Sequence, residues 1–263
     1  MLLNSILNFL FPRYCEICEA PLEAEQKFIC INCNDSLPRT RWWEKRNTPV
    51  VKYKEDDNIF KEIKHESLSI NRRKEYDSFT ENKLATLYYG RIDIERAMAF
   101  LKFSPKTKTA NLVYGFKYYN KPYIAYYLGE MMGKELMESG FFKNIDYIIP
   151  VPITKHRMYE REYNQSYELS RGINKETKIP IEANILKRKR FSVSQTKLNE
   201  VERAENIKGV FTLNSNYRKL CNKHVLLIDD IITTGATTLE CSKVLKSIQG
   251  IRISILSLGF VTI

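Results

Sequence analysis

The segment from Val225 to Thr238, which reads VLLIDDIITTGATT, constrains the fold more than any other part of this chain. It begins with four consecutive apolar residues, a pattern typical of a strand covered on both faces of a parallel sheet. Two acids, Asp229 and Asp230, follow directly, and the carboxyl end of such a strand faces the ligand crevice of an open sheet. The segment therefore predicts an α/β domain built on a parallel sheet.

The residues after the two acids have the composition of a phosphate-binding turn. Small and hydroxyl-bearing residues at the start of a helix offer a phosphate backbone N–H groups, hydroxyls and the positive end of the helix dipole. No Lys follows the glycine, so the turn is not a Walker loop. Because one carboxylate can accept hydrogen bonds from two vicinal hydroxyls, acids and turn together predict a ribose 5-phosphate ligand. The alternative is an ordinary strand-to-helix turn with acids there by chance. The expected phosphate-binding residues are Thr233, Thr234, Gly235, Ala236 and Thr237.

Helix and strand patterns alternate around this segment, as in an open parallel sheet flanked by helices. Gly172 is expected to end one of the helices. The expected helices cover residues 107–119, 122–138, 163–172 and 235–248, and the expected strands cover residues 147–151, 210–213, 225–228 and 252–261.

Four cysteines near the start of the chain have metal-ligand spacing. Cys15, Cys18, Cys30 and Cys33 form the pattern C-x2-C-x11-C-x2-C. A two-residue gap lets both thiolates of a pair reach one tetrahedral zinc, and four thiolates leave no position for water. The quartet therefore predicts a structural zinc site, with a redox dithiol or a disulfide pair as alternatives. Cys221 and Cys241 have no partner at such spacing.

The chain is basic, with 42 Lys and Arg against 31 Asp and Glu. Two stretches hold the excess: residues 101–121 contain five Lys and no acid, and residues 187–223 contain ten Lys or Arg and three Glu. A concentrated positive field suits a polyanionic partner such as phosphate or nucleic acid, although a solvated basic surface is the alternative.

Three regions are expected along the chain. Residues 1–41 form the four-cysteine module, residues 42–89 a polar linker or insertion, and residues 90–263 the α/β domain. The sequence contains no run of 18 apolar residues, so no membrane-spanning helix is expected. The start has no basic region ahead of its apolar residues, so we expect a short amphipathic helix there and not a signal peptide. The expected location is the cytoplasm, where cysteines favour metal or free thiols.

Residues 225–238 resemble the thirteen-residue phosphoribosyl-pyrophosphate (PRPP) motif of type I phosphoribosyltransferases. A four-cysteine knuckle ahead of such a domain resembles the ComF (ComFC) family, which is linked to natural competence. Two further blocks resemble that family. One is Pro150-Val151-Pro152 followed by Lys155, Arg157, Arg161 and Tyr163-Asn164-Gln165. The other is Arg188, Arg190, Gln195, Leu198, Arg203, Asn206, Gly209 and Phe211.

The resemblance implies the type I phosphoribosyltransferase fold with a small N-terminal zinc-binding module. It implies a phosphoribosyltransferase, active or vestigial, in which a base displaces pyrophosphate from PRPP with Mg²⁺ bound. A regulator that only senses PRPP is a further alternative. The implied roles are ribose contact and catalysis for Asp229 and Asp230, 5-phosphate binding for residues 233–237, pyrophosphate binding for Lys155 and Arg157, and catalysis from a closing loop for Arg188 and Arg190. The acceptor base is not indicated.

The ComF resemblance also implies a link to single-stranded DNA and the DNA-uptake machinery. Within residues 101–121, lysines alternate with aromatic residues, a composition that can follow a strand and stack its bases. The alternative is a helix that buries its aromatic residues and exposes its lysines. The lysines are Lys102, Lys106, Lys108, Lys117 and Lys121, and the aromatic residues are Phe103, Tyr114, Phe116, Tyr118 and Tyr119.

Overall fold

The structure is a computed structural model that describes residues 12–44, 82–189 and 209–261. Its strands are β1 (Arg96–Phe103), β2 (Tyr147–Pro150), β3 (Leu186–Arg188), β4 (Phe211–Leu213), β5 (His224–Ile232) and β6 (Arg252–Val261). Its helices are α2 (Ile31–Asp35), η1 (Trp42–Glu44), α4 (Lys83–Thr86), α5 (Ala110–Tyr118), α6 (Pro122–Met137), α7 (Lys155–Arg161), α8 (Gln165–Thr177), η4 (Ser215–Leu220) and α10 (Ala236–Leu245).

Four strands form one parallel sheet in the order β1-β6-β5-β2. The apolar start of β5 runs in register with β2, so that Pro150 lies opposite Ile228. β3 and β4 form a separate antiparallel pair. The sheet with its flanking helices, together with the N-terminal cysteine module, confirms the predicted fold class.

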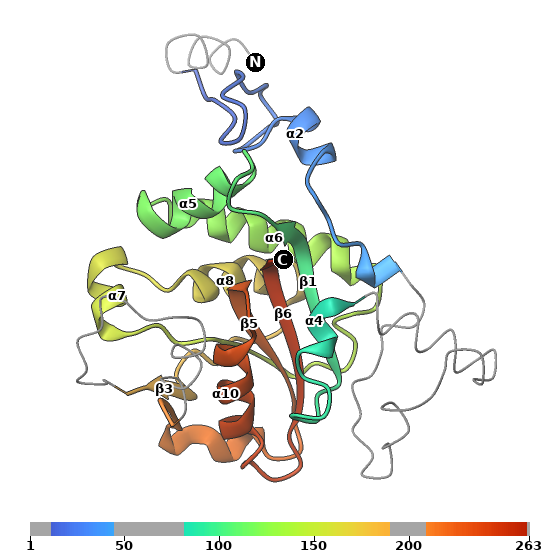
Figure 1. Ribbon diagram of the computed structural model, residues 1–263, viewed down its shortest axis with the longest axis vertical. Coiled ribbons are helices and arrows are strands. Elements are labelled where there is room, and N and C mark those ends of the chain that lie inside the picture. Colours follow the sequence, from blue (N-terminus) through green and yellow to red (C-terminus); the bar gives the residue numbers. More distant parts are fainter. Residues whose placement is uncertain (1–11, 45–81, 190–208, 262–263) are drawn as a thin grey trace, which may run out of the picture.

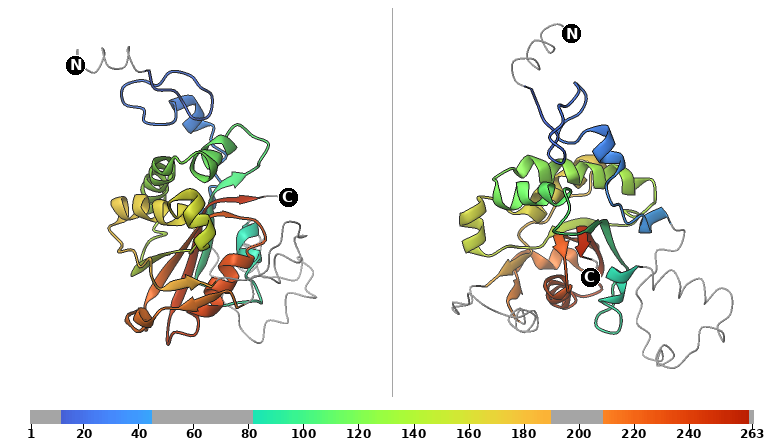
Figure 2. Two further views of the ribbon diagram at one scale, coloured as in Figure 1. Left: turned by 90° about the vertical axis from the view of Figure 1, so that its left-hand side faces the viewer. Right: turned by 45° about the horizontal axis from the view of Figure 1, so that its top comes forward.

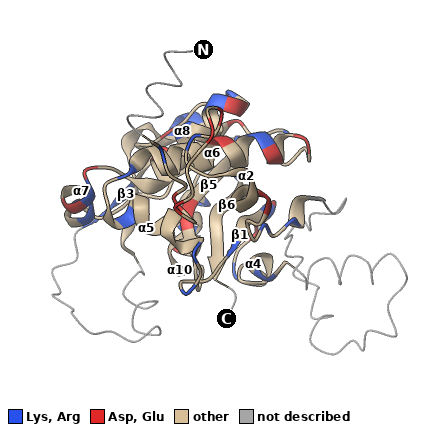
Figure 3. Ribbon diagram, turned by 90° about the horizontal axis from the view of Figure 1, so that it is seen from above, with Lys and Arg blue, Asp and Glu red and all other residues tan. Residues whose placement is uncertain are grey.

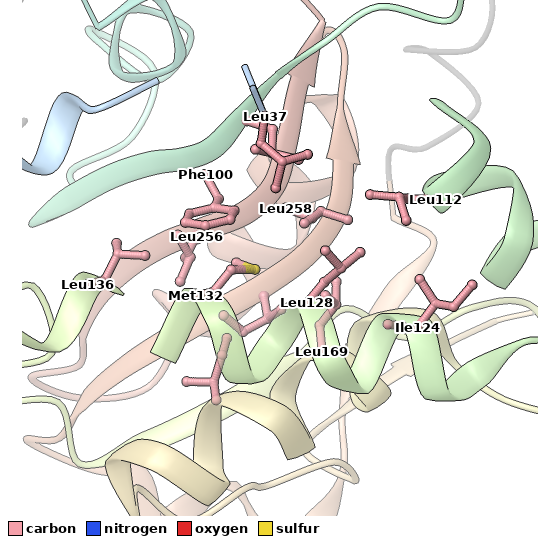
Figure 4. Packing of buried hydrophobic residues seen from close by; sticks show 14 of the residues in the cluster. Leu37, Phe100, Leu112, Ile124, Leu128, Met132, Leu136, Leu169, Leu256 and Leu258 are labelled. Atoms are coloured by element: carbon pink, nitrogen blue, oxygen red, sulfur yellow. The ribbon is translucent and has the colours of Figure 1, made fainter. Parts of the chain in front are cut away.

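Helices cover both faces of the sheet (Figure 2): α6 and α8 lie on one face, and α10 and α4 lie on the other. Successive residues of a strand point to opposite faces, so neighbours such as Leu226 and Leu227 of β5 belong to different apolar clusters. Figure 4 shows the first cluster, in which Met132 of α6 lies beside Leu256 of β6 and Leu128 of α6 faces Leu258 of the same strand. Burial on both faces explains why β5 reads as a continuous apolar run.

The region predicted as one helix over residues 163–172 is built differently. α7 precedes it, and α8 continues through Gly172 to Thr177, so the prediction that Gly172 ends a helix is wrong. Lys178, with φ 61°, is the residue that ends α8. Gly172 instead lies where α8 meets α6: a Cβ atom there would sit 2.1 Å from the carbonyl oxygen of Tyr126.

The cysteine module and its following segment dock on α6 and β1. Arg39 makes a two-bond ion pair with Glu135 of α6, with both nitrogen–oxygen distances 2.7 Å. Lys121 Nζ lies 2.7 Å from Glu16 Oε2. Trp43 is buried and stacks on Phe100 of β1, with ring centroids 5.4 Å apart. These contacts join the module to the domain that holds the sheet (Figure 1).

The described end of the predicted linker, residues 82–89, lies against the sheet. Leu84, Ala85 and Tyr88 are buried in the cluster on the α10 face. Asn82 caps α4 and donates a 2.8 Å hydrogen bond from its amide to the carbonyl of Ala97 in β1. Residues 45–81 and the expected helix over residues 2–10 lie outside the described residues, and the boundaries of the three predicted regions stay predictions.

Candidate functional site

Asp229 and Asp230 lie near the carboxyl end of β5, beside the end of β2. The N–H of Val151, which follows β2, donates a 2.8 Å hydrogen bond to the carbonyl of Ile228. Ser166, in the first turn of α8, lies 3.4 Å from Asp229, hydroxyl oxygen to Oδ1. Two strand ends and the start of α8 therefore converge on the carboxyl pair, as expected at the ligand edge of an open sheet.

The Asp229 carboxyl holds its proton more strongly than an ordinary aspartate. Burial and the neighbouring Asp230 carboxylate both disfavour its charged form and raise its pKa to about 7. The N–H of Asp230, the charge of Lys117 and the hydroxyl of Ser166 oppose this rise in pKa. A raised carboxyl pKa beside a second carboxylate is common where proteins bind or transform ligands.

The sequence did not single out Lys117 as a member of this site. The Nζ atom of Lys117, in the last turn of α5, lies 3.0 Å from Oδ2 of Asp230. In the sequence, Lys117 is one of several lysines in a basic stretch, and only the packing of α5 turns it toward β5. Ser166 was also missed, although it directly follows the Tyr163-Asn164-Gln165 block.

The predicted phosphate turn leads from β5 into α10. Gly235 has φ 71° and immediately precedes the first residue of α10, a conformation in which glycine avoids a steric penalty. Thr233 and Thr234 are exposed, while Ala236 and Thr237 are partly buried. The N–H groups at the start of α10 have no partner within the helix, which is the arrangement that favours anions.

Leu87 and Tyr88, which precede β1, pack against this turn. The hydroxyl of Tyr88 lies 2.6 Å from that of Thr238, and both side chains are buried. Thr238 also donates a 3.0 Å hydrogen bond to the carbonyl of Gly235. A Cβ on Gly235 would come 3.0 Å from Leu87. The segment ahead of β1 thus fixes the position of the turn, a contact that no sequence pattern indicated.

Lys155 and Arg157, the predicted pyrophosphate residues, lie on α7, which follows the end of β2. Both side chains are exposed. Thr154 caps α7 by accepting a 3.2 Å hydrogen bond from the N–H of Arg157. The hydroxyl of Tyr163, just after α7, donates to the carbonyl of Phe116 in α5. α7 is therefore tied both to the end of β2 and to the helix that carries Lys117.

Arg188 reaches the same region from β3. Its guanidinium lies 5.3 Å from the ring centroid of Phe211, and its Nε is buried without a hydrogen-bond partner among the described residues. Burial and then the charge of Arg157 lower its pKa, while Cys241 and Asp229 act to raise it. Figure 3 shows the Lys and Arg of α7 and β3 on neighbouring segments. Arg190 lies outside the described residues.

The four predicted zinc ligands come together in space. The Sγ atoms of Cys15, Cys18, Cys30 and Cys33 all lie within 4.8 Å of one another, and those of Cys18 and Cys30 are 3.7 Å apart. Tetrahedral zinc with bonds of about 2.3 Å would place sulfurs about 3.8 Å apart, so the cluster is compatible with a structural zinc site. Burial acts to raise the pKa of the Cys15 thiol, but hydrogen bonds from backbone N–H groups, beginning with that of Cys30, lower it to about 7.

Sequence comparison finds relatives for part of the chain. It is 38% identical to competence protein F of Haemophilus influenzae over 101 residues, which are 38% of this chain and 44% of that protein. It is 27% identical to DNA utilization protein YhgH of Salmonella typhimurium over 137 residues, which are 51% of this chain and 59% of that protein. The chain thus spans less than two thirds of either relative. No family model matches the chain.

Structural comparison returns phosphoribosyl-handling proteins at low similarity. The glutamine phosphoribosylpyrophosphate amidotransferase of Bacillus subtilis shares 19% identity with a TM-score of 0.33, covering 50% of this chain and 25% of that one. The adenine phosphoribosyltransferase of Leishmania tarentolae shares 17% identity with a TM-score of 0.32, covering 52% of this chain and 58% of that one. None of the helices among the described residues is both long and apolar enough to cross a bilayer.

Proposed function

Because this chain is a homologue of competence protein F over the 101 matched residues, we propose that it is a phosphoribosyltransferase-like protein of DNA uptake. Its ligand is PRPP or a related ribose 5-phosphate, bound in the crevice at the carboxyl ends of β2 and β5. One observation carries the proposal. The Asp229–Asp230 pair lies near the end of β5, and the turn at residues 233–237 follows it at the same edge of the sheet.

Each part of the crevice suits one part of PRPP. The carboxylates of Asp229 and Asp230 accept hydrogen bonds from the ribose hydroxyls. The turn into α10 donates its N–H groups and hydroxyls to the 5-phosphate. Arg188, Lys155 and Arg157 neutralise the pyrophosphate, whose charge increases as it leaves. Mg²⁺, when it binds together with PRPP, supplies further positive charge on the pyrophosphate.

Binding of PRPP with Mg²⁺, measured by calorimetry, tests the proposal. Asp229→Ala combined with Asp230→Ala should abolish binding, because the hydroxyl acceptors of the sugar site are removed. Asp93→Ala with Asp146→Ala is the matched control, since it removes the same number of carboxylates from outside the crevice. Failure of the wild-type protein to bind PRPP at millimolar concentration would contradict the proposal.

Turnover is tested separately, because binding alone suits a vestigial enzyme or a sensor of PRPP. Release of pyrophosphate from PRPP is measured with a panel of purine and pyrimidine bases. Release with one base, lost in the Asp229→Ala and Asp230→Ala double variant, identifies an active transferase and its acceptor. Tight PRPP binding without release identifies a protein that only binds its ligand.

The role in DNA uptake rests on the names of the relatives, competence protein F and DNA utilization protein YhgH. We place the protein in the cytoplasm, where its six cysteines, all free in the described structure, are retained as thiols or metal ligands. Deletion of its gene should lower the frequency of transformation, and a plasmid copy should restore it. An unchanged frequency contradicts this role.

Direct binding of single-stranded DNA is a second candidate function. Tyr118 and Tyr119, at the end of α5, are 67% and 69% exposed, and Arg161 lies 5.5 Å from the ring centroid of Tyr118. Phe116 is buried instead, so only part of the aromatic series is at the surface. Lys106 and Lys108 are exposed nearby in sequence. Exposed aromatic rings with cations can stack bases and neutralise phosphates.

The DNA candidate is tested by the salt dependence of affinity for a single-stranded oligonucleotide. Affinity should fall steeply from 50 to 200 mM salt, because phosphate contacts release counterions. Tyr119→Ala and Lys108→Glu should weaken binding, whereas Lys143→Glu, an exposed change beyond α6, should not. An affinity that is the same at low and high salt would exclude phosphate-driven binding.

A further inference from the structure

Lys117 differs from the exposed lysines of its basic stretch. Its Nζ lies 3.0 Å from Oδ2 of Asp230, and the two side chains are only 18% and 15% exposed. Lys106 and Lys108 belong to the same stretch and are exposed. An ion pair this shielded is screened by salt much less than a surface pair. Lys117 is therefore better described as part of the crevice than as part of a DNA-binding surface.

The turn of α5 that carries Lys117 is fixed on both sides. The carbonyl of Phe116 accepts a hydrogen bond from the hydroxyl of Tyr163. The ring of Tyr118 lies under the guanidinium of Arg161, at the end of α7. Since α7 holds the predicted pyrophosphate residues, α5 joins that helix to the carboxyl pair. Lys117 is thus held in place by its neighbours as well as by Asp230.

Charges from several elements act on the carboxyl pair. Asp229 is influenced by Asp230 on its own strand, by Lys117 of α5, by the Ser166 hydroxyl of α8, by Arg188 of β3, and by Tyr88 and Cys241. Two members of this set are cations. Arg188 stacks on Phe211, whereas Lys117 directly contacts Asp230, one member of the pair. Among the described residues, Lys117 is consequently the cation best placed to offset the repulsion between the two carboxylates.

We propose that Lys117 is a positioning residue of the sugar site. It holds the Asp230 carboxylate in the orientation that receives the ligand hydroxyls, and its charge allows both acids to be ionised when the ligand binds. This inference rests on the proposed function, because it concerns the site for a ribose 5-phosphate ligand. It adds a residue that neither the PRPP-like motif nor the pyrophosphate block contains.

The test compares the wild-type protein with Lys117→Met and Lys117→Arg. Titration of the aspartate carboxyl carbons by NMR, without ligand, reports the ionisation of the pair. Lys117→Met should move the titration of Asp229 to higher pH, because a favourable charge is lost. Its affinity for PRPP with Mg²⁺ should fall at least tenfold at pH 7 and partly recover as the pH rises. Lys117→Arg should keep both properties close to wild type.

Lys121→Met is the matched control, since Lys121 also makes an ion pair but with Glu16 of the cysteine module. It should leave both the carboxyl titration and PRPP affinity unchanged. Lys117→Gln replaces Lys117→Met if the latter fails to fold, as judged by its thermal transition. An unmoved carboxyl titration in Lys117→Met, or in Lys117→Gln where that variant replaces it, overturns the proposal whatever the affinity. Failure of wild type to bind PRPP contradicts the proposed function instead, and the ligand-free titration still decides the role of Lys117.

Discussion

Ionisation of the Asp229 carboxyl is strongly disfavoured in the folded protein. Its pKa of about 7 lies well above the usual value near 3.8, mainly because burial and then the Asp230 charge disfavour ionisation. Between these two pH values the folded protein retains a proton that the unfolded chain has lost. The contribution of Asp229 to the free energy of unfolding therefore decreases as the pH rises from about 4 to about 7.

Asp229→Asn should stabilise the protein at pH 8 and do so much less at pH 5, where the penalty is only partly developed. The amide is isosteric and uncharged, and its oxygen can still accept hydrogen bonds from the N–H of Asp230 and the hydroxyl of Ser166. A gain of about 2 kcal/mol at pH 8 is expected from a pKa shift of this size, discounted for the coupled pair. Urea unfolding at the two pH values measures the effect. An equal change at pH 5 and pH 8 would show that charge is not its cause.

Site residues could be predicted from the sequence where they are close together in the sequence itself. Asp229, Asp230 and the following turn belong to one segment, so their proximity was predictable. Lys117 meets Asp230 across more than one hundred residues, and its contact depends on how α5 packs. Tyr88 likewise supports Thr238 from a region predicted to be a polar linker. Contacts of this kind follow from tertiary packing and leave no local pattern.

Among the elements, α6 and α8 approach each other unusually closely. Each helix presents a glycine to the other: a Cβ on Gly129 would lie 2.2 Å from the carbonyl oxygen of Leu169, and one on Gly172 would lie 2.5 Å from the N–H nitrogen of Glu130. The close crossing positions α8, whose first turn brings Ser166 to the carboxyl pair. The sequence suggested a helix end at Gly172 because glycine is common there, but backbone contact is the reason for glycine at this position.

Gly172→Ala should destabilise the protein by about 3 kcal/mol, because the new methyl group meets backbone atoms that cannot rotate away. Gly115→Ala is the matched control, also within a helix. Its methyl group would meet only flexible side chains, the tip of Ile124 at 2.8 Å and Lys121 at 3.7 Å. The expected cost there is below about 1 kcal/mol, partly offset by the higher helix propensity of alanine. Thermal or urea unfolding distinguishes the two, and equal losses would contradict the backbone contact.

At the scale of the whole molecule, salt bridges join the four-cysteine module and the segment that follows it to the α/β domain. Arg39 pairs with Glu135, Lys121 with Glu16, and Lys27 with Glu130, which also pairs with Lys175. Glu130 is buried, and the positive charges of Lys27 and Lys175 offset the free-energy cost of burying its carboxylate. The sequence predicted the cluster from its spacing, whereas the bridges depend on how the module docks on α6.

We propose that the cluster holds one structural zinc, and the purified protein should contain about one zinc per chain. Cys18→Ser with Cys33→Ser should reduce the zinc content to nearly zero and lower the temperature of unfolding, because metal binding contributes to folding. Cys221→Ser is the control outside the cluster and should retain the metal. Elemental analysis and thermal unfolding measure both effects. A protein that is folded and essentially free of metal would contradict the zinc site.

The outer edge of β1 accepts hydrogen bonds from two segments that are far apart in the sequence. Thr40 donates its hydroxyl hydrogen bond to the carbonyl of Ala99, and Asn82 donates its amide hydrogen bond to that of Ala97, two residues away on the same strand. The chain is thus anchored to this edge on both sides of residues 45–81, by Thr40 before them and by Asn82 after them. An insertion between these two anchors would therefore not have to disturb the hydrogen bonds that Thr40 and Asn82 donate to β1.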